Sequence, residues 1–375
     1  MSSERMTVAV TGAAGYLGRR LIRSLCAEGR VERVLGFDTQ PPRFRSEKFV
    51  FDTLDVRDER LGSRLAGADV LVHLAFVMNA VSRRSGRARP ASRRSGRARP
   101  ASADEASMRD INVNGTQNVF HCAADAGVAK LVYPSSATVY GAHPDNQVPL
   151  TEKSPLRANL DFSYAAHKLE VEYIAREFRA EHPEVVLTLF RPALVCGAGV
   201  DNAWSRLIEA PVRFAIKDHS PPFQFVHADD VVAALGLATF NDLDGVFNLT
   251  PRGWLEHDEA AGLLGHRPKE LSAPVAFSLM GRLWDRGLAE APAGMLHYLM
   301  YPWVMSGAKL TEAGFVCEHS NAETLQEALS HLLPYVRIGR ARVPRATLRR
   351  SATVAAAGAV AAAALRAARR VRSSS

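Results

Sequence analysis

The stretch MTVAVTGAAGYLG, residues 6–18, decides the fold of this 375-residue chain. Its first part, residues 6–12, is a run of β-branched and small apolar residues that ends in glycine, which predicts a short buried strand. The segment RRLIRSLCAEG, residues 19–29, has apolar side chains at helical spacing and stops at a glycine, which predicts a helix. A strand, a glycine-rich turn and a helix therefore follow one another near the start of the chain.

The turn between this strand and this helix contains three evenly spaced glycines, Gly12, Gly15 and Gly18. Glycines there allow a tight turn and a close approach of the backbone to a pyrophosphate group. The helix that follows presents unpaired N–H groups and the positive end of its dipole, so we expect Tyr16 and Leu17 to contribute to binding. The turn predicts a dinucleotide-binding site; the alternative is an ordinary strand-to-helix turn.

Strand-like and helix-like patterns alternate through the first half of the chain. Further strands are predicted at residues 33–38, 68–76, 129–136 and 185–192, and helices at 108–127 and 164–182. This alternation implies right-handed crossovers and a mostly parallel sheet covered on both faces, and so an α/β, doubly wound fold. Ligands of such sheets bind beyond the carboxyl ends of the strands, so the residues that leave each strand are the site candidates.

An acidic residue, Asp38, ends the second predicted strand, twenty residues after Gly18. A carboxylate at this position accepts hydrogen bonds from the adenosine ribose hydroxyls and repels a 2′-phosphate, which favours NAD over NADP as the cofactor. The nearby Arg43 and Arg45 argue in the opposite direction.

A serine, a tyrosine and a lysine are the candidate catalytic residues. Ser136 ends a predicted strand, while Tyr164 and Lys168 lie four apart and therefore on one helix face. The lysine ammonium and a bound nicotinamide cation are expected to lower the pKa of Tyr164, which could then exchange a proton with a substrate hydroxyl as hydride moves. Ser136 is expected to hold the same oxygen, and Lys168 to reach the nicotinamide ribose as well.

Eight short motifs support this interpretation, and they are TGAAGYLG, LDVRD, HLAF, NVNGT, SSATVYG, YAAHK, RPALVCG and FVHADDV. With them the chain resembles an extended short-chain dehydrogenase/reductase of the NAD-dependent epimerase/dehydratase family. The resemblance runs from residue 6 to about 232 and continues more weakly to about 335. It implies a Rossmann-type NAD-binding sheet with a smaller C-terminal substrate lobe.

The resemblance also implies roles for residues outside the glycine turn and the catalytic trio. The implied cofactor contacts are Asp55 and Val56 at the adenine, Leu74 and Ala75 along the cofactor, Asn112 as a supporting helix residue, and Pro192 to Val195 at the nicotinamide. His227 and Asp230 resemble structural positions beside the second lobe. No residue is expected to bind a metal.

Two departures from the family pattern bear on the substrate. Members that use nucleotide sugars often carry an Arg-Asp pair where this chain has Phe223 and Gln224, and sugar dehydratases carry an Asp-Glu pair where it has Ala137 and Thr138. Dehydration is therefore disfavoured. The expected lobe is rich in Leu, Met and aromatic residues, which fits ordinary core packing or an apolar pocket for a sterol-like, isoprenoid or lipid alcohol.

The domain organisation follows from the same resemblance. Residues 1–194 are expected to form the NAD-binding domain, with an inserted Arg-rich loop at 77–107. Residues 195–335 form mainly the substrate lobe, with 226–250 returning to the first domain, and 336–375 form a basic, Ala-rich, flexible tail.

Positive charge is concentrated in two segments. Residues 82–101 repeat one ten-residue sequence twice and hold eight arginines, and residues 337–375 hold ten more, with no acid in either segment. The chain's 47 Lys and Arg residues include these eighteen, so 29 basic residues face 39 acidic ones elsewhere. An acidic body with basic appendages argues against a specific nucleic-acid-binding domain. The repeat is expected to be a mobile, duplicated insertion at the rim of the site.

Compartment and assembly are less clearly indicated. The four cysteines have no paired spacing and residues 1–10 lack a long apolar stretch, so we expect a reducing, cytoplasmic location. The apolar run at 354–365 is too short to span a bilayer, and contact of the tail with a membrane surface is disfavoured. A homodimer remains an open alternative.

The sequence thus predicts an NAD-dependent enzyme that interconverts a secondary alcohol and a ketone in a small-molecule substrate. Two alternatives stay open: a nucleotide-sugar epimerase of the same family, and an NAD-binding scaffold or sensor without turnover.

Overall fold

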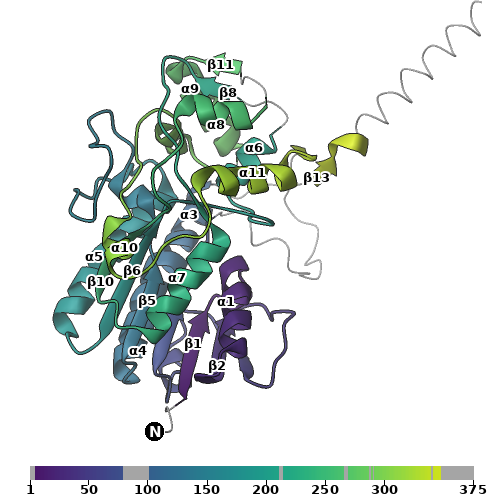
Figure 1. The fold of residues 1–375 in the computed structure, drawn as a ribbon. Helices are drawn as coiled ribbons and strands as arrows, with labels where there is room; N and C mark the ends of the chain where they lie inside the picture. The colour runs from purple at the N-terminus through teal and green to yellow at the C-terminus, as the bar shows by residue number, and fades with distance from the viewer. Residues whose placement is uncertain are drawn as a thin grey trace, which may run out of the picture.

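The structure, a computed structural model, describes residues 5–78, 101–210, 214–265, 269–286, 289, 291–338 and 341–347. Figure 1 shows a sheet with helices packed along it and a smaller group of elements, including β8, β11, α8 and α9, beyond one end of that sheet. The Arg-rich repeat, except its last residue, and the chain after residue 347 lie outside the described residues, so the predictions made for them stay predictions.

The central sheet has seven strands in the order β10-β6-β5-β4-β1-β2-β3, and every neighbouring pair is parallel. These strands are β1 (Met6–Thr11), β2 (Val31–Asp38), β3 (Phe49–Thr53), β4 (Val70–His73), β5 (Lys130–Pro134), β6 (Val186–Pro192) and β10 (Gly245–Leu249). The chain reverses its direction of travel across the sheet between β1 and β4, and the crevice at the carboxyl ends there is where such folds bind ligands. The expected doubly wound, Rossmann-type sheet is confirmed.

Helices cover both faces of the sheet. The helices that pack on it are α1 (Tyr16–Ala27), α2 (Leu61–Arg64), α4 (Gly115–Asp125), α5 (Ser163–Glu181) and α7 (Ala228–Phe240). Side chains of a strand alternate between faces, so in β1 Val8 and Val10 pack into the core beneath α1 and α7, while Ala9 packs into the core beneath α2, α4 and α5.

Some element boundaries differ from the sequence-based predictions. Strand β3, at the edge of the sheet, was not predicted, because its partly exposed side chains show neither a clear alternation nor a continuous apolar run. The helix predicted at 108–127 is three consecutive pieces, α3 (Ala101–Arg109), a π-helical turn η2 (Asp110–Asn114) and α4. The prediction that the loop continues to residue 107 was therefore wrong, since the chain is helical from Ala101.

The smaller group of elements is built from short pieces. They are β7 (Leu194–Cys196), α6 (Ala203–Ile208), β8 (Phe214–Ile216), β9 (Phe225–His227), α8 (His257–Leu263), β11 (Lys269–Leu271), α9 (Ala273–Asp285), the 3₁₀ helix η4 (Ala293–Leu299), α10 (Ala308–Glu312) and α11 (Asn321–Leu332). Strands β7 and β9 pair in parallel, as do β8 and β11.

The chain after α11 is more ordered than predicted. Strands β12 (Tyr335–Ile338) and β13 (Ala341–Pro344) form an antiparallel pair. Arg337 and Arg342 from this pair both bind Glu209, a carboxylate whose side chain is only 1% exposed. A flexible tail beginning at 336 was therefore the wrong expectation, because two of its arginines are needed to compensate a buried charge.

Candidate active site

The glycine turn is held against the end of β4. Gly12 has a φ of +69°, and a Cβ at this residue would meet the backbone of Leu74 and Ala75 at 2.7 Å. A Cβ on Gly18 would overlap the carbonyl oxygen of Gly12. Only glycine therefore permits this turn, and the turn places Leu74 and Ala75 beside the predicted pyrophosphate site.

The start of α1 fits an anionic group. Intrahelical bonding begins with the Arg19 amide, which donates to the Gly15 carbonyl oxygen. Tyr16, Leu17 and Gly18 occupy the first turn, whose N–H groups precede the first intrahelical donors, and no acidic residue lies in that turn. The expected cofactor contacts are thus placed where backbone donors and the helix dipole favour a pyrophosphate.

Asp38 lies at the end of β2 and is tied to the same turn. One of its carboxylate oxygens accepts from the Ala14 amide and the other from the Gln40 amide, each at 3.0 Å. Each oxygen keeps lone-pair capacity for a ribose hydroxyl. Both of the nearby arginines, Arg43 and Arg45, are exposed.

Asp55 has a structural partner that the sequence analysis missed. Arg57 donates to both carboxylate oxygens of Asp55, at 2.9 and 2.7 Å, and also to Asp110 on η2. These bonds raise the pKa of Arg57 above its usual value. The Asp55 side chain therefore helps to fasten η2 to the sheet, while Val56 is buried against the start of α4 at Gly115.

Asn112 acts on other parts of the protein. Its side-chain oxygen accepts from the Val77 amide at 2.7 Å, and its side-chain nitrogen donates to the Val77 carbonyl at 2.8 Å and faces His167 Nδ1 at 3.3 Å. Asn112 thus joins the π-helical turn to the chain leaving β4 and to α5. We assign it a supporting role, because these contacts occupy its amide.

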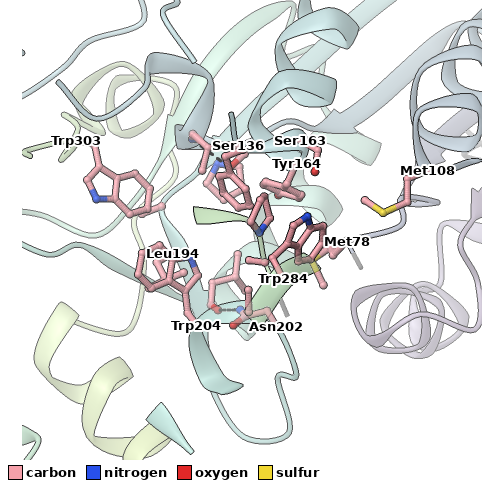
Figure 2. Close-up of a pocket in the computed structure, with 18 residues that line it drawn as sticks. Met78, Met108, Ser136, Ser163, Tyr164, Leu194, Asn202, Trp204, Trp284 and Trp303 are labelled. Carbon is pink, nitrogen blue, oxygen red and sulfur yellow. Dashed lines mark hydrogen bonds between the residues drawn. The ribbon is translucent and has the colours of Figure 1, made fainter. Parts of the chain in front are cut away.

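Two of the three candidate catalytic side chains are brought together at the entrance of a cavity (Figure 2). Ser136 Oγ accepts from the Thr138 amide at 3.2 Å and from the Thr138 hydroxyl at 2.9 Å, which leaves its own hydrogen free to donate. Burial raises the pKa of Tyr164, and a hydrogen bond with Ser136 opposes that rise. The two hydroxyls are therefore neighbours.

The third candidate, Lys168, is buried in aromatic surroundings. Its Nζ donates to Tyr133 Oη at 2.9 Å and to the Pro134 carbonyl at 2.7 Å, and lies 3.8 Å from the centre of the Phe76 ring. Phe76 in turn packs edge-on against Tyr164. Burial lowers the pKa of Lys168 to about 7, against the opposing effect of Glu172.

The pKa of Tyr164 is raised in the protein itself, and the lower value expected with the nicotinamide bound stays a prediction. The expected decrease combined the charge of Lys168 with that of a bound nicotinamide. In the protein itself, burial is the larger cause and raises the value. The ammonium of Lys168 is used by Tyr133 and by the carbonyl of Pro134.

A buried ion pair fixes the helix that carries Tyr164. Arg191 on β6 forms two hydrogen bonds with Glu172 on α5, at 2.9 and 2.6 Å, and a third with Tyr140 Oη at 2.8 Å. The pair was not predicted, although a single arginine in the otherwise apolar strand at 185–192 is a signal for a buried partner.

The cavity beside Ser136 and Tyr164 is mostly apolar. Its lining comes from the end of β4, η3 (Ala137–Tyr140), α5, the chain from Pro192 to Val195, α6 and α9, and includes Met78, Met108, Phe162, Leu194, Trp204, Trp284 and Trp303. Figure 2 shows three tryptophans, Trp204, Trp284 and Trp303, among the side chains that line the cavity together with Ser136 and Tyr164. Pro192 and Val195 border this cavity, and their contact with the nicotinamide stays a prediction.

The loop after β7 reaches back to the glycine turn. The Tyr16 hydroxyl donates to the Ala198 carbonyl at 2.7 Å, and Asn202 donates to the Val195 carbonyl at 3.0 Å. The side chains of Tyr16 and Asn202 thus hold the chain around Val195 and Ala198, which lies between the glycine turn and the cavity at Ser136 and Tyr164.

His227 and Asp230, which resemble structural positions beside the second lobe, both have hydrogen-bond partners within the protein. Asp230 accepts from the amides of Glu318 and His319, and His227 accepts from the Asp229 amide at the start of α7. Both residues therefore join α7 to its neighbours, and neither lines the cavity.

Comparison with known proteins completes this description. The model of the NAD dependent epimerase/dehydratase family matches residues 8–94 and 91–249, which is more than half of the chain. The chain belongs to this family. It is therefore an NAD-dependent enzyme, and the glycine turn, the first turn of α1 and Asp38 fit that cofactor.

Several proteins are similar to this family member. Rv0501, an uncharacterised protein of Mycobacterium tuberculosis (strain ATCC 25618 / H37Rv), is 25% identical over 328 residues, which cover 85% of this chain and 82% of that protein. A 4-hydroxy-2-methyl-3-oxo-4-farnesyl-3,4-dihydroquinoline-1-oxide ketoreductase of Stigmatella aurantiaca is 29% identical over 209 residues, 55% of each chain.

Solved structures share the fold. The structure of MoeE5 in complex with UDP-glucuronic acid and NAD has a TM-score of 0.64 and 23% identity, and covers 87% of this chain and 98% of its own. DesIV, a dTDP-glucose 4,6-dehydratase from Streptomyces venezuelae, has a TM-score of 0.63 and 21% identity, with 87% and 96% covered. At these identities the likeness concerns the fold.

Among the described residues, no helix combines the length and the apolar character needed to cross a membrane. All four cysteines lie among those residues and are unpaired.

Proposed function

We propose that this family member is an NAD-dependent oxidoreductase that interconverts a secondary alcohol and a ketone on a largely apolar small molecule. The observation that carries the proposal is the adjacent pair of hydroxyls, Ser136 and Tyr164, at the opening of an apolar cavity. The cofactor, when bound, supplies or accepts the hydride.

The two hydroxyls divide the work on the substrate oxygen. Ser136 accepts two hydrogen bonds from Thr138 and faces Tyr164 with its own O–H, which can turn to hold the substrate oxygen when substrate binds. Burial keeps Tyr164 protonated at neutral pH, which suits donation of a proton to a ketone oxygen that becomes an alcohol. In the reverse direction the phenolate form of Tyr164 receives the proton of the alcohol, so oxidation requires Tyr164 to lose its own proton first.

Lys168 and the buried pair behind it position these groups. Lys168 binds Tyr133 and the Pro134 carbonyl at the end of β5, two residues before Ser136. Its contact with the nicotinamide ribose is part of the proposal. The bidentate pair of Glu172 with Arg191 joins α5 to strand β6, and it thereby helps to fix the position of Tyr164 on the same helix.

Two features argue against a nucleotide-sugar substrate. Gln224 stands where nucleotide-sugar enzymes often have an Asp. Its Nε2 donates to the carbonyls of Gly253 and Met305, and its Oε1 accepts from the Met305 amide. Phe223, in place of an arginine, packs on Phe225. The ketoreductase relative, whose name includes a farnesyl group, is consistent with an apolar ketone.

The second candidate is epimerisation of a nucleotide sugar, which the family match favours. It uses the same serine and tyrosine. It differs from the first candidate in requiring a site for a nucleotide diphosphate.

The test is Tyr164→Phe with a panel of apolar ketones and NADH. Turnover should fall by about 10²- to 10⁴-fold, while NADH binding, followed by cofactor fluorescence, stays within twofold. Tyr173→Phe, on the exposed face of the same helix, is the matched control and should keep full activity.

Two results would contradict the proposal. An unchanged rate in Tyr164→Phe would remove its chemical basis. Micromolar affinity for a UDP- or dTDP-sugar in calorimetry, with no turnover of any ketone, would establish the epimerase instead.

A further inference from the structure

A second apolar cavity lies next to the first. It is enclosed by α6, β8, β9, α8 and α11, and its lining includes Leu207, Ile208, Phe214, Ile216, Phe223, Phe225, Ala260, Ala261, Leu264, Leu299 and Leu325. Leu194 and Trp204 line both cavities. We call the one at Ser136 and Tyr164 the catalytic chamber and the other the lobe chamber.

Among the residues that the structure describes, no charged side chain lines the lobe chamber. The titratable lining residues in those ranges are His219 and His257. His219 Nδ1 lies 3.2 Å from the Met300 carbonyl, and His257 Nδ1 is buried without a hydrogen-bond partner in the described part of the chain. A diphosphate placed here would lose its hydration without gaining a cation, which is unfavourable.

Trp204 lines both chambers, and its surroundings hold it in place. Its ring stacks on Trp303 of the catalytic chamber, with centroids 6.1 Å apart. The short helix α6 that carries it starts with a capping box between Asn202 and Ser205, and Asn202 is bonded to Val195. Figure 2 shows Trp204 next to Leu194 on the side of the catalytic chamber away from Met108.

We propose that the lobe chamber binds a flexible hydrocarbon chain of the substrate, whose alcohol or ketone carbon lies at Tyr164 in the catalytic chamber. The inference rests on the proposed function and narrows its substrate to amphiphiles with a linear saturated or prenyl chain. Three observations support it: the absence of a charged side chain from the lining among the described residues, the sharing of Leu194 and Trp204 by the two chambers, and the position of Phe223 among the lobe-chamber residues.

Chain length provides the test. We would measure kcat/KM with NADH for 2-alkanones from butanone to hexadecan-2-one, and binding of the same ketones by quenching of tryptophan fluorescence. Each methylene that enters the chamber should raise kcat/KM by about fourfold, until the chamber is full and the series levels off.

Filling the chamber should remove this dependence. Ala261→Phe places a ring among the lobe-chamber residues, and should lower kcat/KM for dodecan-2-one at least tenfold while leaving pentan-2-one within twofold. Gly262→Phe is the matched control, because it adds the same ring to the next residue of α8, where a Cβ meets nothing within 4 Å. It should leave the whole series unchanged.

The outcomes separate the two proposals. A flat series, or the same slope in Ala261→Phe as in the parent, overturns the lobe chamber while turnover of short ketones upholds the proposed function. A different result is that the unmodified protein turns over no ketone, while dodecan-2-one quenches its tryptophan fluorescence and Ala261→Phe abolishes that quenching. This result would overturn the proposed function and keep the lobe chamber as a binding site for a hydrocarbon chain. A prenyl ketone should behave like the alkanones. A higher kcat/KM for a rigid 3-ketosteroid than for the alkanones, unchanged in Ala261→Phe, would contradict the inference.

Discussion

Two buried carboxylates show how differently the two regions of this molecule are built. In the sheet region, Glu172 and Arg191 form a bidentate pair whose side chains are only 3% and 5% exposed. In the lobe region, Glu209 is as buried, but its partners Arg337 and Arg342 are 16% and 40% exposed. Water screens the second cluster and cannot reach the first.

The difference follows the work of the regions. The sheet region holds reacting atoms, and small shifts of α5 would misplace Tyr164, so closely fitted polar contacts lie behind it. The lobe region encloses an apolar cavity, where a ligand would be held by the volume that it fills and not by directional hydrogen bonds. The strands that the lobe adds, β7, β8, β9 and β11, have only three residues each, and its helices range from five residues to thirteen.

The largest expected effect is on the sheet-region pair. Glu172→Ala should lower the free energy of unfolding by about 3–5 kcal/mol, because it leaves the Arg191 charge buried and unpaired. Urea denaturation would measure it. Glu170→Ala, which breaks the exposed pair with Arg109 on the same helix, is the control and should cost less than about 1 kcal/mol.

A second way to test the dry sheet region is through pH. Burial lowers the pKa of Lys168 to about 7 in the folded protein, below its value of about 10.4 in the unfolded chain. The unfolded chain then binds more protons between these values, so Lys168 costs stability progressively as pH falls from about 10 to about 7, and the cost is constant below that.

The comparison with Lys168→Met isolates this effect. The stability of the parent relative to the variant should increase by about 1 kcal/mol per pH unit from pH 7 to 10. Parallel stability curves for the two proteins over this range would mean that Lys168 is solvated and that the sheet region is wetter than described.

A smaller effect is expected at the cofactor end of the sheet. Asp38→Ala removes a charged hydrogen-bond acceptor for the ribose and the repulsion of a 2′-phosphate, so the preference for NADH over NADPH should narrow by about tenfold. Titration of cofactor fluorescence would measure it. An NADPH preference in the unmodified protein would show that Arg43 and Arg45 outweigh Asp38.

The smallest effect is expected in the lobe. Glu209→Gln keeps the shape of the side chain and should destabilise the β12–β13 pair by about 1 kcal/mol, a roughly fivefold increase in local opening. Hydrogen exchange at the Arg337 amide, which donates to the Glu209 carbonyl, reports this opening. Glu318→Gln, at an exposed site, is the control and should leave this hydrogen exchange unchanged. Equal effects of Glu209→Gln and Glu172→Gln on the free energy of unfolding would contradict the difference between the two regions.

Sequence patterns predicted the sheet region well, because its signals are local. A glycine that must have positive φ, a strand that must be apolar and a Tyr and Lys on one helix face are all visible within a few residues. The edge strand β3, the helix at residues 101–107 and the ordered chain at 335–344 were missed, because their stability comes from neighbours distant in sequence.

The partners of the site residues were also beyond prediction. Neither the pairing of Arg57 with Asp55 and Asp110 nor that of Arg191 with Glu172 follows from spacing alone. An arginine in a buried strand signals a partner but does not name it. Burial of Tyr164, which raises its pKa in the protein itself, was likewise not visible in the sequence, since burial is a property of the assembled core.

The sequence by itself determined the parallel sheet, the cofactor class and the chemical groups at the strand ends, because each depends on a short segment whose geometry the backbone imposes. Only the tertiary structure decided what those groups face. Leu194, Trp204, Phe223 and Ala261 lie on four separate segments, and their apolar character has no functional meaning until packing closes them around one space. Hydrophobic burial is non-directional, so the shape of a chamber emerges only when the segments that enclose it have met.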